Sequence, residues 1–132
     1  MNHREALFIT EKVRPWILKH SDKFKNIVFE AKETENTICD NDFEPQQLPS
    51  LEAASAAFGL YCKIPDGSGI ATPFDGFHIA NAKAFVAIEF RDKGWVMIDY
   101  EKWKKKTVRR IGWDAAKDLT NFWYRAKHDN IC

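Results

Sequence analysis

The first half of the chain alternates between helical and strand-like patterns of apolar residues. Over residues 2–19 apolar side chains recur at helical spacing and predict a helix, although Pro15 leaves open whether that helix is kinked or divided into two. Residues 26–32 begin with three strand-forming side chains and predict a strand. The Ala-rich segment 45–61 predicts a second helix, which ends near Gly59 and is able to lie close on a sheet.

The second half predicts a series of strands and one further helix. Apolar runs separated by turn sequences such as PDGSG and RDKG predict three or four strands, over residues 60–64, 73–79, 84–90 and 95–99. The basic stretch KWKKKTVRR is interpreted as a linker, and residues 114–126 as a final helix. This order of elements predicts an α/β (α+β) fold, with helices packed against one mixed sheet in a single domain.

Composition and charge narrow the class of protein only in part. A chain of 132 residues, 45% hydrophobic and 14% aromatic, is long and apolar enough for a packed core, which argues against disorder. The formal charge is +1, from 20 basic and 19 acidic residues. A nucleic-acid partner is therefore neither required nor excluded, because a local basic patch is sufficient for binding.

Cysteine usage and the N-terminus favour a reducing compartment. Cys39, Cys62 and Cys132 are odd in number and lack the spacing of metal ligands, so neither a disulfide framework nor a zinc site is expected. The N-terminal residues mix charged with apolar side chains, and no apolar run approaches the roughly 18 residues that span a bilayer. We expect a cytoplasmic protein without a membrane partner.

The sequence FEAKET contains the first candidate for chemistry. Strand alternation places Glu30 and Lys32 on the same face. One interpretation is a metal-binding carboxylate beside a lysine that orients or activates water at a scissile phosphate. The other is a solvated charge pair on an edge strand, and the spacing alone favours this second interpretation.

Several single residues are weaker candidates. Gln47, at the start of the second helix, could reach a metal-bound water or a phosphate, or is simply an exposed polar residue. Asp75 lies within a run of strand residues and either faces solvent or is held by a partner, because an unpaired buried carboxylate is costly. Helical geometry turns Glu5 inward and Glu11 outward. Lys63 is either an edge residue or a second cation that faces phosphate.

The basic stretch near the C-terminus is a candidate surface for a phosphate backbone. Its cations are interleaved with Trp103 and comprise Lys102, Lys104, Lys105, Lys106, Arg109 and Arg110. Such a cluster can bind nucleic acid through electrostatic attraction. A run of charge is more often a solvated segment, so this pattern alone is weak.

Taken in order, these motifs resemble one family. An inward Glu in the first helix, FEAKET on a strand, PQQL at a helix start, YCKIPD on a strand and TPFDGF on the next are similar to the Holliday junction resolvase-like members of the PD-(D/E)XK nuclease superfamily. The small phage-encoded versions related to the RecU recombination proteins are the most similar. The resemblance implies a restriction-endonuclease-like core over residues 1–103, with residues 104–132 as a basic linker and a helix packed on the same domain.

The resemblance also implies roles for individual residues. Glu30, Asp75 and Glu5 would be ligands of Mg²⁺, for which Mn²⁺ would substitute, with Glu11 as the fallback for Glu5. Lys32 would position or activate the attacking water, and Gln47 matches the family glutamine near the site.

One departure from the family pattern affects the metal site. The superfamily carries an Asp on a strand that precedes the FEAKET strand, but here the first helix runs almost directly into that strand, and Asp22 lies in the connector. Asp75 is therefore expected to supply the missing carboxylate.

We therefore expect a Mg²⁺-dependent DNA endonuclease that cuts branched DNA. Specifically, we expect a Holliday junction resolvase that acts on four-way junctions as a homodimer. If a phage encodes it, the protein acts in the host cytoplasm. A flap or another branched form is an alternative substrate. A nuclease-fold protein that has lost catalysis and binds DNA or a protein partner is the alternative function.

Overall fold

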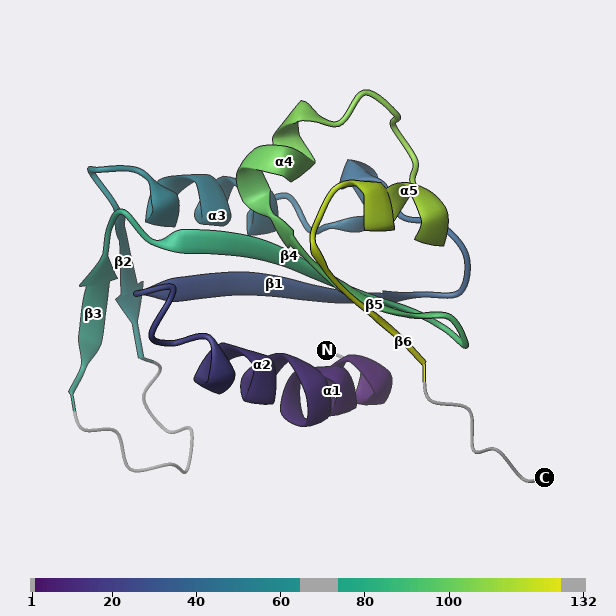
Figure 1. The fold of residues 1–132 in the computed structure, drawn as a ribbon. Helices are drawn as coiled ribbons and strands as arrows, with labels where there is room; N and C mark the ends of the chain where they lie inside the picture. Colours follow the sequence, from purple (N-terminus) through teal and green to yellow (C-terminus); the bar gives the residue numbers. More distant parts are fainter. Residues whose placement is uncertain (1, 65–73, 127–132) are drawn as a thin grey trace.

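The computed structural model describes residues 2–64 and 74–126 and places them in one α+β domain (Figure 1). The main sheet is mixed and has four strands, in the order β1 (Ile27–Thr34), β4 (Lys83–Phe90), β5 (Gly94–Asp99) and β6 (Phe122–Arg125). A separate antiparallel hairpin consists of β2 (Leu60–Lys63) and β3 (Gly76–Ile79). The prediction of a single domain with a mixed sheet and flanking helices is therefore confirmed.

The N-terminal helix is continuous but contains a wider turn. It consists of α1 (His3–Phe8), the π-helical turn η1 (Ile9–Val13) and α2 (Arg14–Lys19). In the wider turn the Arg14 N–H donates to the Ile9 carbonyl, five residues earlier, directly before Pro15. Because proline has no N–H to donate, this turn lets the helix pass through Pro15 without dividing.

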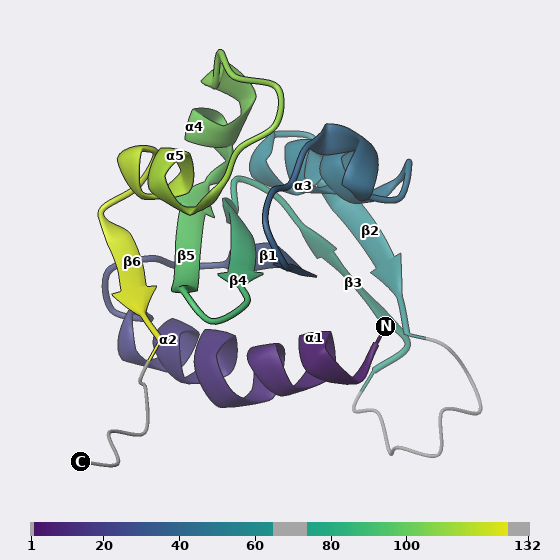
Figure 2. The ribbon, with the colours of Figure 1, turned by 90° about the vertical axis from the view of Figure 1, so that its right-hand side faces the viewer.

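Helices cover both faces of the main sheet (Figure 2). The α1–α2 segment packs on one face, where Phe8, Val13 and Trp16 are buried with Phe85 and Ala87 of β4. The other face is covered by α3 (Gln47–Ser55), α4 (Tyr100–Lys105) and α5 (Trp113–Asp118). Strand β4 is buried on both sides, which explains its nearly continuous apolar sequence.

The strand pairing determines which β1 side chains face which layer. Strand β1 runs parallel to β4, with Glu30 opposite Val86, whereas the β4–β5 and β5–β6 pairs are antiparallel. Phe29 and Ala31 pack with the α1–α2 layer, and Val28 packs with the other layer. Alternation along the strand therefore directs Glu30 to the α3 side.

The C-terminal quarter differs from the prediction. The predicted helix over residues 114–126 is wrong beyond Asp118, because the helix ends at that residue and residues 122–125 form β6. The Thr120 hydroxyl donates to the Met97 carbonyl and accepts the Phe122 N–H, which turns the chain back along β5. Tyr124 is then fixed by a hydrogen bond from Trp16 Nε1 to its hydroxyl, at 2.9 Å.

Other boundaries also shift. The first part of the predicted basic linker is helical, because the Asp99 side chain accepts the Glu101 N–H and begins α4. The second helix spans only Gln47–Ser55, and a short 3₁₀ turn, Asp40–Asp42, interrupts the preceding polar loop. The strands predicted over residues 60–64 and 73–79 pair with each other and not with the main sheet, and residue 73 lies outside the described residues.

Across residues 2–64 and 74–126, the helices are all too short or too polar to cross a membrane.

Candidate functional site

Glu30 lies on β1, at the edge of the four-stranded sheet, and is half-buried beneath the start of α3. Lys32 follows two residues later on the same face, as alternation predicts. The Lys32 ammonium lies 5.5 Å from the centroid of the buried Phe43 ring, a cation–π contact that holds the side chain near the sheet. The acid and the lysine of FEAKET are therefore adjacent and directed toward α3.

Gln47 joins α3 to Glu30. Its Nε2 donates to Glu30 Oε1 at 2.8 Å, and its Oε1 accepts the backbone N–H of Glu44 at 2.9 Å. Both ends of the amide are thus engaged, and the hydrogen-bond pattern fixes its orientation. The structure therefore brings together Glu30, Lys32 and Gln47, three residues that the sequence singled out.

The pKa of Glu30 is raised above the ordinary value of a glutamic acid. Burial of the carboxyl is the largest cause; the ammonium of Lys32 acts in the opposite direction, and the negative charges of Glu5 and Glu44 raise the pKa further. Glu5 belongs to α1, which packs on the face of the sheet opposite to α3, and β1 is the edge strand between these two layers (Figure 2).

Glu5 is more buried than Glu11, in the direction that their helical spacing predicted. Glu5 is half-buried, and its carboxylate accepts a hydrogen bond from Asn2 Nδ2 at 2.9 Å. Glu11 is exposed. Glu5 is therefore the carboxylate of this helix that contributes to the electrostatics of Glu30.

Sequence reasoning missed Glu44. It lies in the exposed loop before α3, and its backbone N–H is tied to Gln47. An acidic residue three positions before a helix-initiating glutamine is the local signal that could have indicated it, because residues with this spacing meet at a helix N-terminus.

Asp75 and Lys63 lie on the hairpin, beside the end of the sheet where β1 begins (Figure 1). Both are exposed, and the Asp75 carbonyl accepts the Ile64 N–H at 2.8 Å. Over residues 2–64 and 74–126, no three His, Cys, Asp or Glu side chains are grouped so that they could hold a metal ion. Glu30, Glu5 and Asp75 therefore do not form the expected set of three ligands.

A cavity of about 400 Å³ separates the hairpin from Glu30. Glu30 and Gln47 line one side of it, and Cys62 and Phe77 line the hairpin side. Because Lys63 follows Cys62 on the same strand, alternation turns the lysine away from this cavity. Glu30 therefore lies beside a cavity that is partly open to solvent and partly lined by apolar side chains.

Half of the predicted DNA-binding cations form ion pairs within the protein. Lys104 pairs with Glu52 and Glu101, Lys106 with Asp40, and Arg110 with Asp42. The cations for which the described part of the chain offers no such partner are Lys102, Lys105 and Arg109. These last three are exposed and available to a ligand.

No family model, curated protein or solved structure matches this chain.

The carboxylates around Glu30 are of the type that binds Mg²⁺. This ion is commonly held by one or two carboxylates together with waters and substrate phosphate, not by an all-protein cage. Glu30 together with Glu5 or Glu44 would supply that number of donors. Burial is the largest cause of the raised pKa of Glu30 and the carboxylates of Glu5 and Glu44 add to it, so a cation beside Glu30 would stabilise its charged form.

Proposed function

We propose that this protein is a Mg²⁺-dependent DNA endonuclease with a restriction-endonuclease-like core. The observation that carries the proposal is the arrangement around Glu30: a half-buried carboxylate fixed by Gln47, with Lys32 on the same face and two further carboxylates close enough to raise its pKa. The parallel pairing of β1 with β4, with α3 packed over both strands, also supports it.

The roles of the side chains follow from their positions. Gln47 holds Glu30 Oε1 and so fixes the carboxylate on the cavity side of β1. Bound Mg²⁺ would supply a water that is nucleophilic near neutral pH and would neutralise charge on the phosphate. Glu30, with Glu5 or Glu44, would hold the ion, and the Lys32 ammonium would stabilise the negative charge that develops on the scissile phosphate.

We propose branched DNA, in particular the four-way junction, as the substrate. Symmetric cutting of a junction requires two active sites related by a twofold axis, so we propose a homodimer. Lys105 and Arg109 are exposed, and they are the cations of the predicted basic segment that we assign to the DNA backbone.

A second function, binding of DNA without cleavage, is favoured by one observation. Asp75 is exposed on the hairpin and does not complete a three-carboxylate site with Glu30 and Glu5. A nuclease core that lacks this carboxylate would retain the basic surface for binding while losing the chemical step.

The test is cleavage of a synthetic four-way junction beside a linear duplex and a flap, each with Mg²⁺, with Mn²⁺ and with EDTA. Metal-dependent, symmetric nicking of the junction alone is the expected result. Equal cutting of all three substrates would retain the nuclease and reject the junction as its substrate. Binding of the junction without cleavage in either metal would reject the nuclease in favour of the binding function.

A further inference from the structure

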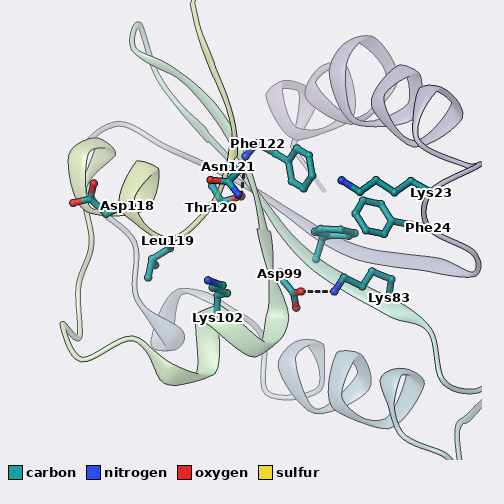
Figure 3. Close-up of a pocket in the computed structure, with 11 residues that line it drawn as sticks. Lys23, Phe24, Lys83, Asp99, Lys102, Asp118, Leu119, Thr120, Asn121 and Phe122 are labelled. Carbon is teal, nitrogen blue, oxygen red and sulfur yellow. Dashed lines mark hydrogen bonds and ion pairs between the residues drawn. The ribbon is translucent and has the colours of Figure 1, made fainter.

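A second cavity, of about 310 Å³, lies at the end of the main sheet where β4 begins and β5 ends, between the connector after α2 on one side and α4 with the segment after α5 on the other (Figure 3). It has no lining residue in common with the cavity beside Glu30. Its volume is at the lower end of the range of about 300–1,000 Å³ typical of small-molecule sites. The cavity is therefore large enough for a small organic ligand and is separate from the proposed active site.

Three lysines reach this cavity from three different segments. Lys23 comes from the connector after α2, Lys83 from the first residue of β4, and Lys102 from α4. The Lys23 ammonium lies 5.3 Å and the Lys83 ammonium 5.7 Å from the centroid of the same ring, that of Phe24. An anion bound in the cavity would be attracted by each of these ammonium groups.

The carboxylates near the cavity do not neutralise all of this charge. Asp99 forms an ion pair with Lys83. Asp118 lines the cavity, but Figure 3 shows its carboxylate directed away from the three lysines. Within residues 2–64 and 74–126, neither Lys23 nor Lys102 has a carboxylate partner. The cavity therefore has an excess of positive charge.

The remaining walls are suited to the organic part of a ligand. Phe122 supplies an aromatic surface, and the neighbouring Asn121 carries an amide that can both donate and accept hydrogen bonds. Inorganic phosphate would use only the lysines. A ligand that carries a phosphate on a ring system with polar edges would also contact Phe122 and Asn121.

We propose that this cavity binds a phosphate monoester of the size of a mononucleotide. Lys23, Lys83 and Lys102 contact its phosphate, and Phe122 and Asn121 contact its organic part. Two sources share this chemistry: a free nucleotide and the 5′-phosphorylated end of a DNA strand. The proposal does not rest on the nuclease function, because binding at this cavity requires neither Glu30 nor cleavage.

The test is isothermal titration of the full chain, in EDTA, with thymidine 5′-monophosphate, inorganic phosphate and thymidine. Lys23→Met and Lys102→Met each remove one exposed cation, and Lys25→Met makes the same change outside the cavity. Lys83 is left intact because its ion pair with Asp99 belongs to the fold. We expect the monophosphate to bind more tightly than phosphate or thymidine, and each cavity variant to weaken it about tenfold, the effect of one charged hydrogen bond.

Three results would overturn the proposal: no binding of the monophosphate, equal affinity for monophosphate and inorganic phosphate, or equal weakening by Lys25→Met. The source of the ligand is then decided with a short single strand that carries either a 5′-phosphate or a 5′-hydroxyl. Binding of the phosphorylated strand through Lys23 and Lys102 identifies a DNA end, whereas binding of the mononucleotide alone identifies a free nucleotide; both results support the proposed chemistry.

Discussion

The replacement Gln47→Leu tests the arrangement around Glu30 without touching the proposed metal ligands. Leucine keeps a comparable size and helix propensity at the first residue of α3 but removes the hydrogen bond to Glu30 Oε1 and the acceptor for the Glu44 N–H. A hydrogen bond to a charged group contributes about 1.5–3 kcal/mol. Because Glu30 is only half-buried and solvent screens its charge, we expect a loss of about 1–2 kcal/mol near neutral pH.

The pH dependence of the stability loss distinguishes the hydrogen bond to ionised Glu30 from a general effect of the substitution. The Gln47 N–H stabilises the ionised form of Glu30, so its contribution to stability is present above the pKa of Glu30 and is lost as pH falls through that pKa. Urea unfolding, followed by tryptophan fluorescence, should therefore show a difference from wild type near neutral pH that shrinks as pH falls through the raised pKa of Glu30, beginning above the ordinary glutamic acid pKa of 4.5.

The matched control is Gln46→Leu, because Gln46 is exposed and, among the residues that the structure describes, its amide donates to the exposed Glu44 carboxylate and not to Glu30. We expect this control to change stability by less than about 0.5 kcal/mol. Equal stability of Gln47→Leu and wild type near neutral pH, or a loss that does not vary with pH, would refute the reasoning about Glu30.

Three further predictions concern the site, the fold and the basic surface. Glu30→Gln should stabilise the protein near neutral pH, because burial raises the pKa of Glu30 and disfavours its charge; the gain should vanish in urea titrations as pH falls through that pKa. Gly94→Ala should lower the free energy of unfolding by roughly 3 kcal/mol. Gly94 has a φ of +152°, and an added Cβ would lie 2.1 Å from the Tyr124 carbonyl oxygen. An unchanged free energy of unfolding would contradict the β5–β6 pairing. Lys105→Ala should weaken junction binding and reduce the salt dependence of that binding, because Lys105 is exposed. Lys106→Ala should mainly lower stability, because Lys106 pairs with Asp40. An unchanged salt dependence for Lys105→Ala would show that Lys105 does not contact DNA.

The sequence predicted the elements whose pattern is long and regular. Strands β1, β4 and β5 were confirmed within about two residues because continuous or alternating apolar runs bounded by turns specify them. Strand β6 was missed because its four residues follow a helical pattern directly, and the turn depends on the contact of Thr120 with Met97, which no local spacing reveals.

The candidate site was predictable in a similarly uneven way. Alternation alone places Glu30 beside Lys32, but the contact of Gln47 with Glu30 joins residues 17 positions apart and is set by the packing of α3 on β1. The ion pairs of Lys104 and Lys106 also depend on tertiary contacts, so a run of cations in the sequence overstated the charge that is free to bind DNA.

The most direct test of the account is the rate at which wild type, Glu30→Gln, Glu5→Gln and Glu11→Gln cleave a four-way junction in Mg²⁺. Glu5 and Glu11 lie on the same helical segment, but Glu5 alone of the two affects the pKa of Glu30. We expect wild type and Glu11→Gln to cut the junction, Glu30→Gln not to cut it, and Glu5→Gln to be at least tenfold slower, about 1.4 kcal/mol in the barrier. Cleavage by Glu30→Gln at the wild-type rate, or junction binding by every protein with cleavage by none, would contradict it.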